Sequence, residues 1–171
     1  MRGTIQAFPV CILLLVTVYA APQEKGSTAS STYETKRAAI QTVGVKSLQA
    51  ENAHEKAPYC EKALSAADKR TCATDEFQTT DKNYTTYKRA ITYLLRLRDP
   101  DDPDVSNRPN RGEAFRRSER LWLQYREEQC RTVADGSYGG TIQPQILSSC
   151  KQDLTRNHLH ELESLYSDLF E

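Results

Sequence analysis

Residues 118–154 read SERLWLQYREEQCRTVADGSYGGTIQPQILSSCKQDL, and their pattern is the most informative in the chain about its fold. Apolar residues recur at helical spacing on both sides of a glycine-rich segment, DGSYGG at 135–140. The pattern predicts a helix that ends near Cys130, a loop over 135–140 and a returning helix entered near Cys150. We expect a disulfide to hold the loop, and a rigid loop of this kind suits a binding protein.

The N-terminus has the pattern of a secretory signal peptide. Arg2 gives a positive start, residues 10–18 form an apolar stretch of about nine residues, and Val18-Tyr19-Ala20 is a small-x-small cleavage pattern. We expect cleavage after Ala20. The apolar stretch is shorter than the roughly 20 residues that span a bilayer. The sequence therefore predicts a secreted or periplasmic chain without stable membrane insertion.

Four of the five cysteines lie outside the signal peptide, at Cys60, Cys72, Cys130 and Cys150. An even number of cysteines in an oxidising compartment favours two disulfides. Four cysteines allow three pairings, and the sequential one, Cys60–Cys72 with Cys130–Cys150, has the simplest geometry. The fifth, Cys11, raises the alternative of a lipid anchor, but the preceding Phe-Pro-Val lacks the small residue that a lipidated cysteine requires. A zinc site is the other alternative, and no closely spaced Cys or His pair supports it.

Periodic apolar residues predict helices along the rest of the chain, and no alternating pattern of strand length is present. The predicted helices are a weak one over 33–57 that Gly44 interrupts, a short one around 60–67, and three long ones over 72–98, 113–133 and 144–171. The expected organisation is a signal peptide (1–20), a flexible linker with the weak helix (21–57) and a helical domain (58–171). The fold class is therefore all-α, a small disulfide-stapled bundle of about three to four helices.

Each long helix has an expected buried face. The faces consist of Phe77, Thr80, Tyr84, Tyr87, Ile91, Leu94 and Leu95; of Phe115, Ser118, Leu121, Trp122 and Tyr125; and of Ile146, Leu147, Cys150, Leu154, Leu162, Leu165 and Leu169. Trp122 is expected to anchor the core. Arg126 is expected to brace the loop or a neighbouring helix terminus, while Glu127 can form an i,i+4 pair with Arg131.

The charges are balanced overall and clustered locally. The chain has 23 Lys and Arg against 23 Asp and Glu, which argues against a general nucleic-acid binder. Four aspartates gather in RDPDDPD at 98–104, and arginines follow at 108, 111, 116, 117 and 120. This pattern is typical of a solvated loop followed by a charged helix face. A docking surface for a partner that carries both signs is the alternative.

Several of these residues together resemble the LprI-type lysozyme-inhibitor family of small exported helical proteins. The matching residues, in order and spacing, are Trp122-Leu123, Arg126-Glu127, Cys130, Gly139-Gly140, Cys150 and Leu154. The resemblance covers roughly residues 59–165. The chain departs from the family pattern at His158, where an arginine is typical, and around Asn83-Tyr84, where a Leu-Asn pair is usual ahead of a Tyr.

The resemblance implies an exported, non-covalent inhibitor of lysozyme, with lysozyme as the protein partner. The loop between the paired cysteines is the economical place for contact, and we expect Ser137 and Tyr138 to make it, with Asp135 facing the basic surface of lysozyme. A plain turn is the alternative interpretation of this loop. The alternative function is a structural or interaction module of the envelope that keeps the fold without inhibiting.

No pattern indicates an enzyme or a cofactor. The chain lacks G-x-S-x-G, a phosphate-cradling loop and H-E-x-x-H. His158 and His160 are two residues apart and point to different helix faces, which makes them a poor metal pair. Asn83-Tyr84-Thr85 is a glycosylation sequon that matters only in a eukaryotic secretory pathway.

Overall fold

The computed structural model describes residues 27–57, 60–97 and 109–171. Its elements are α1 (Ser27–Glu55), the 3₁₀ turn η1 (Cys60–Lys62), α2 (Ala66–Arg96), α3 (Arg111–Asp135), α4 (Gln143–Tyr166) and the 3₁₀ turn η2 (Ser167–Phe170). The described residues contain helices and no strand, so the predicted all-α class is confirmed. The predicted signal peptide, the cleavage site expected after Ala20, Cys11 and the acidic run 99–104 lie outside the described residues.

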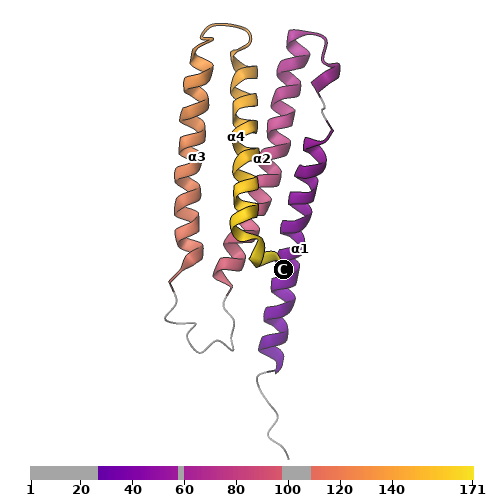
Figure 1. The fold of residues 1–171 in the computed structure, drawn as a ribbon, viewed down its shortest axis with the longest axis vertical. Helices are drawn as coiled ribbons and strands as arrows, with labels where there is room; N and C mark the ends of the chain where they lie inside the picture. The colour runs from indigo at the N-terminus through magenta and orange to yellow at the C-terminus, as the bar shows by residue number, and fades with distance from the viewer. Residues whose placement is uncertain (1–26, 58–59, 98–108) are drawn as a thin grey trace, which may run out of the picture.

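The four long helices run side by side, as Figure 1 shows, with α2 as the central element. It packs against α1, α3 and α4, and α4 also packs against α3. At the C-terminus η2 turns back onto α1. None of the helices in the described ranges is long and apolar enough to cross a membrane.

Helix α1 is longer and better packed than the sequence predicted. It runs without interruption from Ser27 to Glu55, so part of the expected linker is helical. Its buried face consists of small and polar residues, Gly44, Ser47 and Glu51, which an apolar pattern does not reveal. Gly44 does not interrupt the helix. It lets the Phe170 ring approach the helix backbone, because a Cβ at this position would lie 2.3 Å from that ring.

Helix α2 starts where a capping box dictates. The Ser65 hydroxyl accepts from the Asp68 N–H at 3.0 Å, and the Asp68 carboxylate accepts from the Ser65 N–H at 3.1 Å. The short helix expected around 60–67 is therefore wrong: only the single turn η1 precedes the cap, and Leu64 is 92% exposed. The predicted face of α2 is correct from Thr80 to Leu94.

The core lies between α2, α3 and α4. Its buried cluster consists of Tyr84, Tyr87, Ile91, Phe115, Leu159 and Leu162, with Trp122 and Phe170 among the half-buried residues around it. The expected faces of α3 and α4 are partly wrong, since Leu121, Tyr125 and Leu165 are more than half exposed. Glu119, Arg126 and Thr155 are buried in their place. The inner surface of the bundle is therefore more polar than the periodicity indicated.

Both disulfides have the sequential pairing. The Cys60 and Cys72 sulfurs are 2.05 Å apart, and those of Cys130 and Cys150 are 2.08 Å apart. The helices continue past the second pair, because α3 ends at Asp135 and α4 begins at Gln143. The helix end expected near Cys130 is therefore too early, and the helix start expected near Cys150 is too late. The bridge joins two helical turns and not the loop itself.

Candidate functional site

The segment between α3 and α4 is a tight series of turns over residues 136–142 at one end of the bundle (Figure 1). The Tyr138 N–H donates to the Asp135 carbonyl at 3.1 Å, and the Gly140 N–H donates to the Ser137 carbonyl at 2.9 Å. Gly139 has a φ of 73°, a left-handed conformation that glycine adopts without strain. Backbone hydrogen bonds thus define the shape of this loop, while the Cys130–Cys150 bridge holds the two helices that carry it.

Of the three predicted contact residues, Asp135 is the last residue of α3, and Ser137 and Tyr138 follow it in the loop. Tyr138 is 86% exposed, whereas Ser137 is half-buried. The Asp135 carboxylate accepts from the Gln143 side-chain amide at 3.5 Å. Sequence reasoning missed Ile142, which exposes half of its apolar side chain in the same loop. A large exposed aromatic side chain on an ordered turn is a feature of binding surfaces.

A contact from α2 holds the far side of the loop. Arg70 donates from Nη1 to the Thr141 carbonyl at 3.1 Å. No sequence pattern predicts this bond, because the two residues are 71 positions apart. Together with the disulfide, it ties the loop to α2, α3 and α4.

Arg126 joins the middle of three helices. Its guanidinium donates to Asp81 on α2 at 2.6 Å, to the Thr155 hydroxyl on α4 at 2.9 Å and to Glu127 on α3 at 3.1 Å. The expectation that it braces the loop or a helix terminus is therefore wrong, although its structural role stands. Such a fork of charge-assisted hydrogen bonds fixes the relative positions of the helices.

The acidic neighbours of Arg126 also pair differently from the prediction. Glu127 accepts from Lys151 Nζ at 2.5 Å, across the α3–α4 contact. Arg131 pairs with Glu128 at 3.2 Å instead of with Glu127. Burial raises the pKa of Glu127, but the hydrogen bonds and charges of Lys151 and Arg126 outweigh it and hold this pKa below the ordinary value.

A second polar cluster lies under Trp122. The Glu119 carboxylate accepts from the Tyr84 hydroxyl at 2.6 Å and lies 2.9 Å from His158 Nε2. The Trp122 and His158 rings are stacked, with centroids 4.0 Å apart. Burial and the bond to Glu119 raise the pKa of Tyr84 far above its usual range, so this hydroxyl remains a donor.

His158 is the buried member of the histidine pair. Glu161 lies 2.9 Å from its Nδ1, so both ring nitrogens face a carboxylate. His160 lies on another face, beside Glu55 at 3.3 Å. The spacing predicted that the two histidines point to different helix faces, and in the structure they do. Burial alone lowers the pKa of His158, but the bonds to Glu119 and Glu161 outweigh it, and the net shift is upward from 6.5.

This shift predicts a pH dependence of stability. A histidine whose folded pKa exceeds its unfolded value stabilises the fold fully below about pH 6.5, and the contribution is lost as the pH rises through the folded pKa. We therefore expect the free energy of unfolding to fall more between about pH 6 and about pH 9 in the unsubstituted chain than in His158→Gln. Urea unfolding at both pH values measures the difference. His160→Gln is the control. If the unsubstituted chain and His158→Gln lose the same free energy of unfolding between the two pH values, His158 is not the source of the pH dependence.

Asn83, the residue of the glycosylation sequon, belongs to a third cluster around the buried Glu51. The Glu51 carboxylate accepts from Asn83 Nδ2 and from the Thr80 hydroxyl at 2.8 Å each, and from Arg156 Nε at 3.1 Å. These bonds hold the pKa of Glu51 below its ordinary value although burial raises it. The amide nitrogen that a glycan requires is thus engaged in the contact between α1 and α2.

Among the described residues, one group of potential metal ligands comes together. Cys60, Cys72 and Glu76 offer atoms within 4.8 Å of one another. The two sulfurs form the first disulfide, and the Glu76 carboxylate accepts from the Gln152 side-chain amide at 3.0 Å and lies 3.0 Å from His54 Nε2. This arrangement does not make a metal centre.

The comparisons with known proteins agree with this architecture. The family model described as lysozyme inhibitor LprI matches residues 60–162, which is more than half of the chain. An uncharacterised protein of Rhizobium meliloti is 29% identical over 115 residues, which cover 67% of this chain and 83% of that protein. No solved structure gives a significant match. The matched region includes both disulfides and the α3–α4 loop. The chain belongs to the LprI lysozyme-inhibitor family.

Proposed function

We propose that this chain acts after export as a non-enzymatic inhibitor that binds lysozyme without forming a covalent bond. The family match is the observation that carries the proposal. The signal-peptide pattern of residues 1–20 supports export. The two disulfides are of the kind that persists in oxidising compartments outside the cytoplasm.

The proposed contact surface is the α3–α4 loop. Lysozyme hydrolyses its substrate with two carboxyl groups in an open cleft, and a narrow loop with an exposed tyrosine has the shape to enter such a cleft. Tyr138 provides the exposed ring, Ser137 a hydroxyl and Asp135 a carboxylate for a basic partner surface. Because the loop is tied by the disulfide and by Arg70, little conformational entropy is lost on binding.

The primary experiment is an inhibition assay. Purified chain 21–171 is added to several types of lysozyme acting on bacterial cell walls, and the loss of turbidity is followed. We expect saturable inhibition that is independent of incubation time, as for reversible binding. A heat-denatured and reduced sample is the control. No inhibition of any lysozyme at micromolar excess would leave the alternative, an envelope interaction module that has the family fold without the activity.

The double variant Ser137→Ala with Tyr138→Ala tests the loop. Truncating an interface tyrosine that acts as an anchor costs about 2 kcal/mol or more, so we expect inhibition to weaken about thirtyfold. The thermal midpoint should stay nearly unchanged, because Tyr138 is 86% exposed. Tyr125→Ala, on the exposed face of α3, is the matched control and should inhibit normally. If the double variant inhibits as well as the control, the contact surface lies elsewhere on the molecule.

A further inference from the structure

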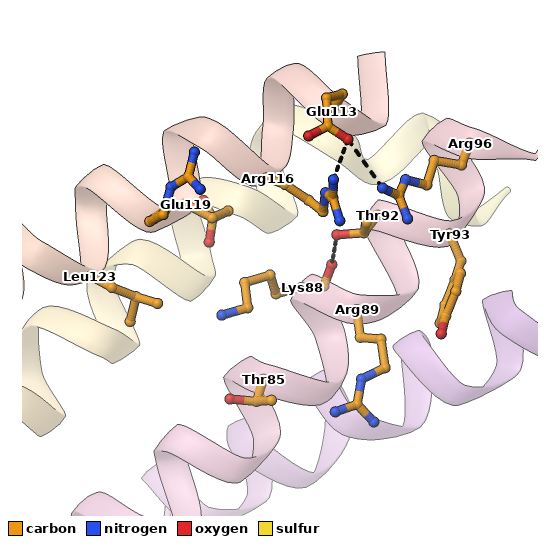
Figure 2. A pocket seen from close by; sticks show the side chains of 11 residues that line it. Thr85, Lys88, Arg89, Thr92, Tyr93, Arg96, Glu113, Arg116, Glu119 and Leu123 are labelled. Atoms are coloured by element: carbon orange, nitrogen blue, oxygen red, sulfur yellow. Dashed lines mark hydrogen bonds and ion pairs between the residues drawn. The ribbon is translucent and has the colours of Figure 1, made fainter. Parts of the chain in front are cut away.

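A groove between α2 and α3 collects positive charge at a distance from the proposed inhibitory loop. It has a volume of about 610 Å³. Figure 2 shows α2 on one side of it and the first half of α3 on the other. The cations that line it are Lys88, Arg89, Arg96, Arg116 and Arg120. The α3–α4 loop follows the opposite end of α3, so the two surfaces are separate.

The two acids of the groove neutralise only part of this charge. Glu113 pairs with Arg96 at 3.2 Å and also with Arg116, as the dashed lines of Figure 2 show. Glu119 is buried and engaged by Tyr84 and His158. Within the described residues, no carboxylate forms an ion pair with the remaining three cations, Lys88, Arg89 and Arg120, although Glu119 and Asp81 attract Lys88 from farther away.

Lys88 is the most confined of these three cations. Its Nζ lies 4.6 Å from the centre of the Tyr84 ring, and Lys88 is half-buried. A cation over an aromatic face is partly stabilised there and keeps its hydrogen-bond donors for a ligand. Three unpaired cations in one groove repel one another, and an anionic ligand would remove that repulsion.

We propose that this groove binds an anionic ligand that carries two or more phosphate groups. Arginine guanidiniums match phosphate oxygens with paired hydrogen bonds, and lysine adds a point charge. The groove extends along α2 from Thr85 to Arg96, which at about 1.5 Å per residue is roughly 16 Å and longer than one phosphate. The chain as a whole is neutral, so the charge is local to this groove. The proposal is independent of lysozyme inhibition.

The test is calorimetric titration of the chain 21–171 with inorganic triphosphate, with citrate as a carboxylate anion of similar charge. Asp99, Asp101, Asp102 and Asp104 adjoin α2 in the sequence and lie outside the described residues, so the titration keeps them in the chain. We expect saturable binding of triphosphate and at least about tenfold weaker binding of citrate. Arg89→Gln with Arg120→Gln should weaken triphosphate binding by at least about tenfold, because the phosphates lose the charge-assisted hydrogen bonds of two guanidiniums.

The matched control is Lys46→Gln with Arg117→Gln, which removes the same charge from exposed positions that do not line the groove. It should stay within about twofold of the unsubstituted chain, because distant surface charges are screened. Equal weakening in both variants, equal binding of citrate, or no saturable binding of triphosphate would overturn the proposal.

Vesicles identify the source of the phosphate. Binding to phosphatidylglycerol vesicles but not to phosphatidylcholine vesicles, with loss in the groove variant, would support a membrane surface as the source. Binding of triphosphate without binding to vesicles would support a soluble ligand. The groove variant should inhibit lysozyme normally, and the loop variant should bind triphosphate normally. Failure of one proposal is therefore distinguishable from failure of the other.

Discussion

Glu119→Ala should lower the free energy of unfolding by about 4 kcal/mol, the largest single-residue effect that we expect in this protein. The Glu119 carboxylate is buried between α2 and α4, where it accepts the Tyr84 hydroxyl at 2.6 Å and faces His158 Nε2 at 2.9 Å. Removing one partner of a buried charged group costs about 3–5 kcal/mol, because the other partner stays buried without compensation. The Tyr84 hydroxyl would also lose its acceptor, and this tyrosine is 0% exposed.

Urea denaturation followed by circular dichroism at neutral pH measures this effect. Glu128→Ala is the matched control on the same helix, since Glu128 is exposed and pairs only with Arg131 on the surface. It should leave the free energy of unfolding nearly unchanged. Glu119→Gln should lie between the two, because the amide oxygen can still accept from Tyr84. Equal stabilities of Glu119→Ala and Glu128→Ala would show that the cluster under Trp122 does not hold the helices together.

Loss of the second disulfide should have the next largest effect. Replacing Cys130 and Cys150 by serine opens a crosslink between positions 20 residues apart. In the chain-entropy account this lowers the free energy of unfolding by about 3 kcal/mol. For a chain of this size the thermal midpoint should fall by roughly 6–12 °C. Differential scanning calorimetry measures the shift directly.

The first disulfide supplies the control for the second. Serine at Cys60 and Cys72 opens a crosslink across 12 residues and should lower the stability by a similar amount. Only the Cys130 and Cys150 variant loosens the α3–α4 loop, so only that variant should inhibit lysozyme more weakly when both are folded at low temperature. If the variant at Cys130 and Cys150 has the same thermal midpoint as the unsubstituted chain, the second disulfide does not stabilise the pair of helices α3 and α4. If the two variants inhibit alike, the shape of the loop does not depend on the bridge.

Some helices could be predicted because their signals are local. The face of α2 from Thr80 to Leu94 follows a helical repeat of bulky residues, and the structure buries it as expected. Pro144 lies in the first turn of α4, where proline is favoured. The sequential cysteine pairing was the simplest geometry, and the structure shows it.

Other elements could not be predicted because they bury polar side chains. The inner face of α1 includes Ser47 and Glu51, and that of α3 includes Glu119 and Arg126. The apolar periodicity places polar residues on the solvent side of a helix. It therefore predicted only a weak first helix and placed Leu121 in the core. A charged residue becomes an inward residue only when a partner from another helix reaches it.

The candidate site divides in the same way. The glycines of the α3–α4 loop and the cysteines on either side of it are evident in the sequence, which pointed to this loop as a constrained surface. The hydrogen bond from Arg70 to Thr141 and the exposure of Ile142 can be seen only in the packed structure, where α2 lies beside the α3–α4 loop. The cationic groove is also a product of packing, since its lining residues come from two helices that are separate in the chain.

The helical class, the cysteine framework, the turn between α3 and α4 and the family of the chain could all be predicted from the amino-acid sequence. These properties depend on spacing and on residue identity over short stretches. Which charges are buried and which surfaces stay open depends instead on how the helices pack. The reason is that Glu51 with Arg156, and Arg126 with Asp81, are 105 and 45 positions apart, so their attraction exists only after the helices have packed.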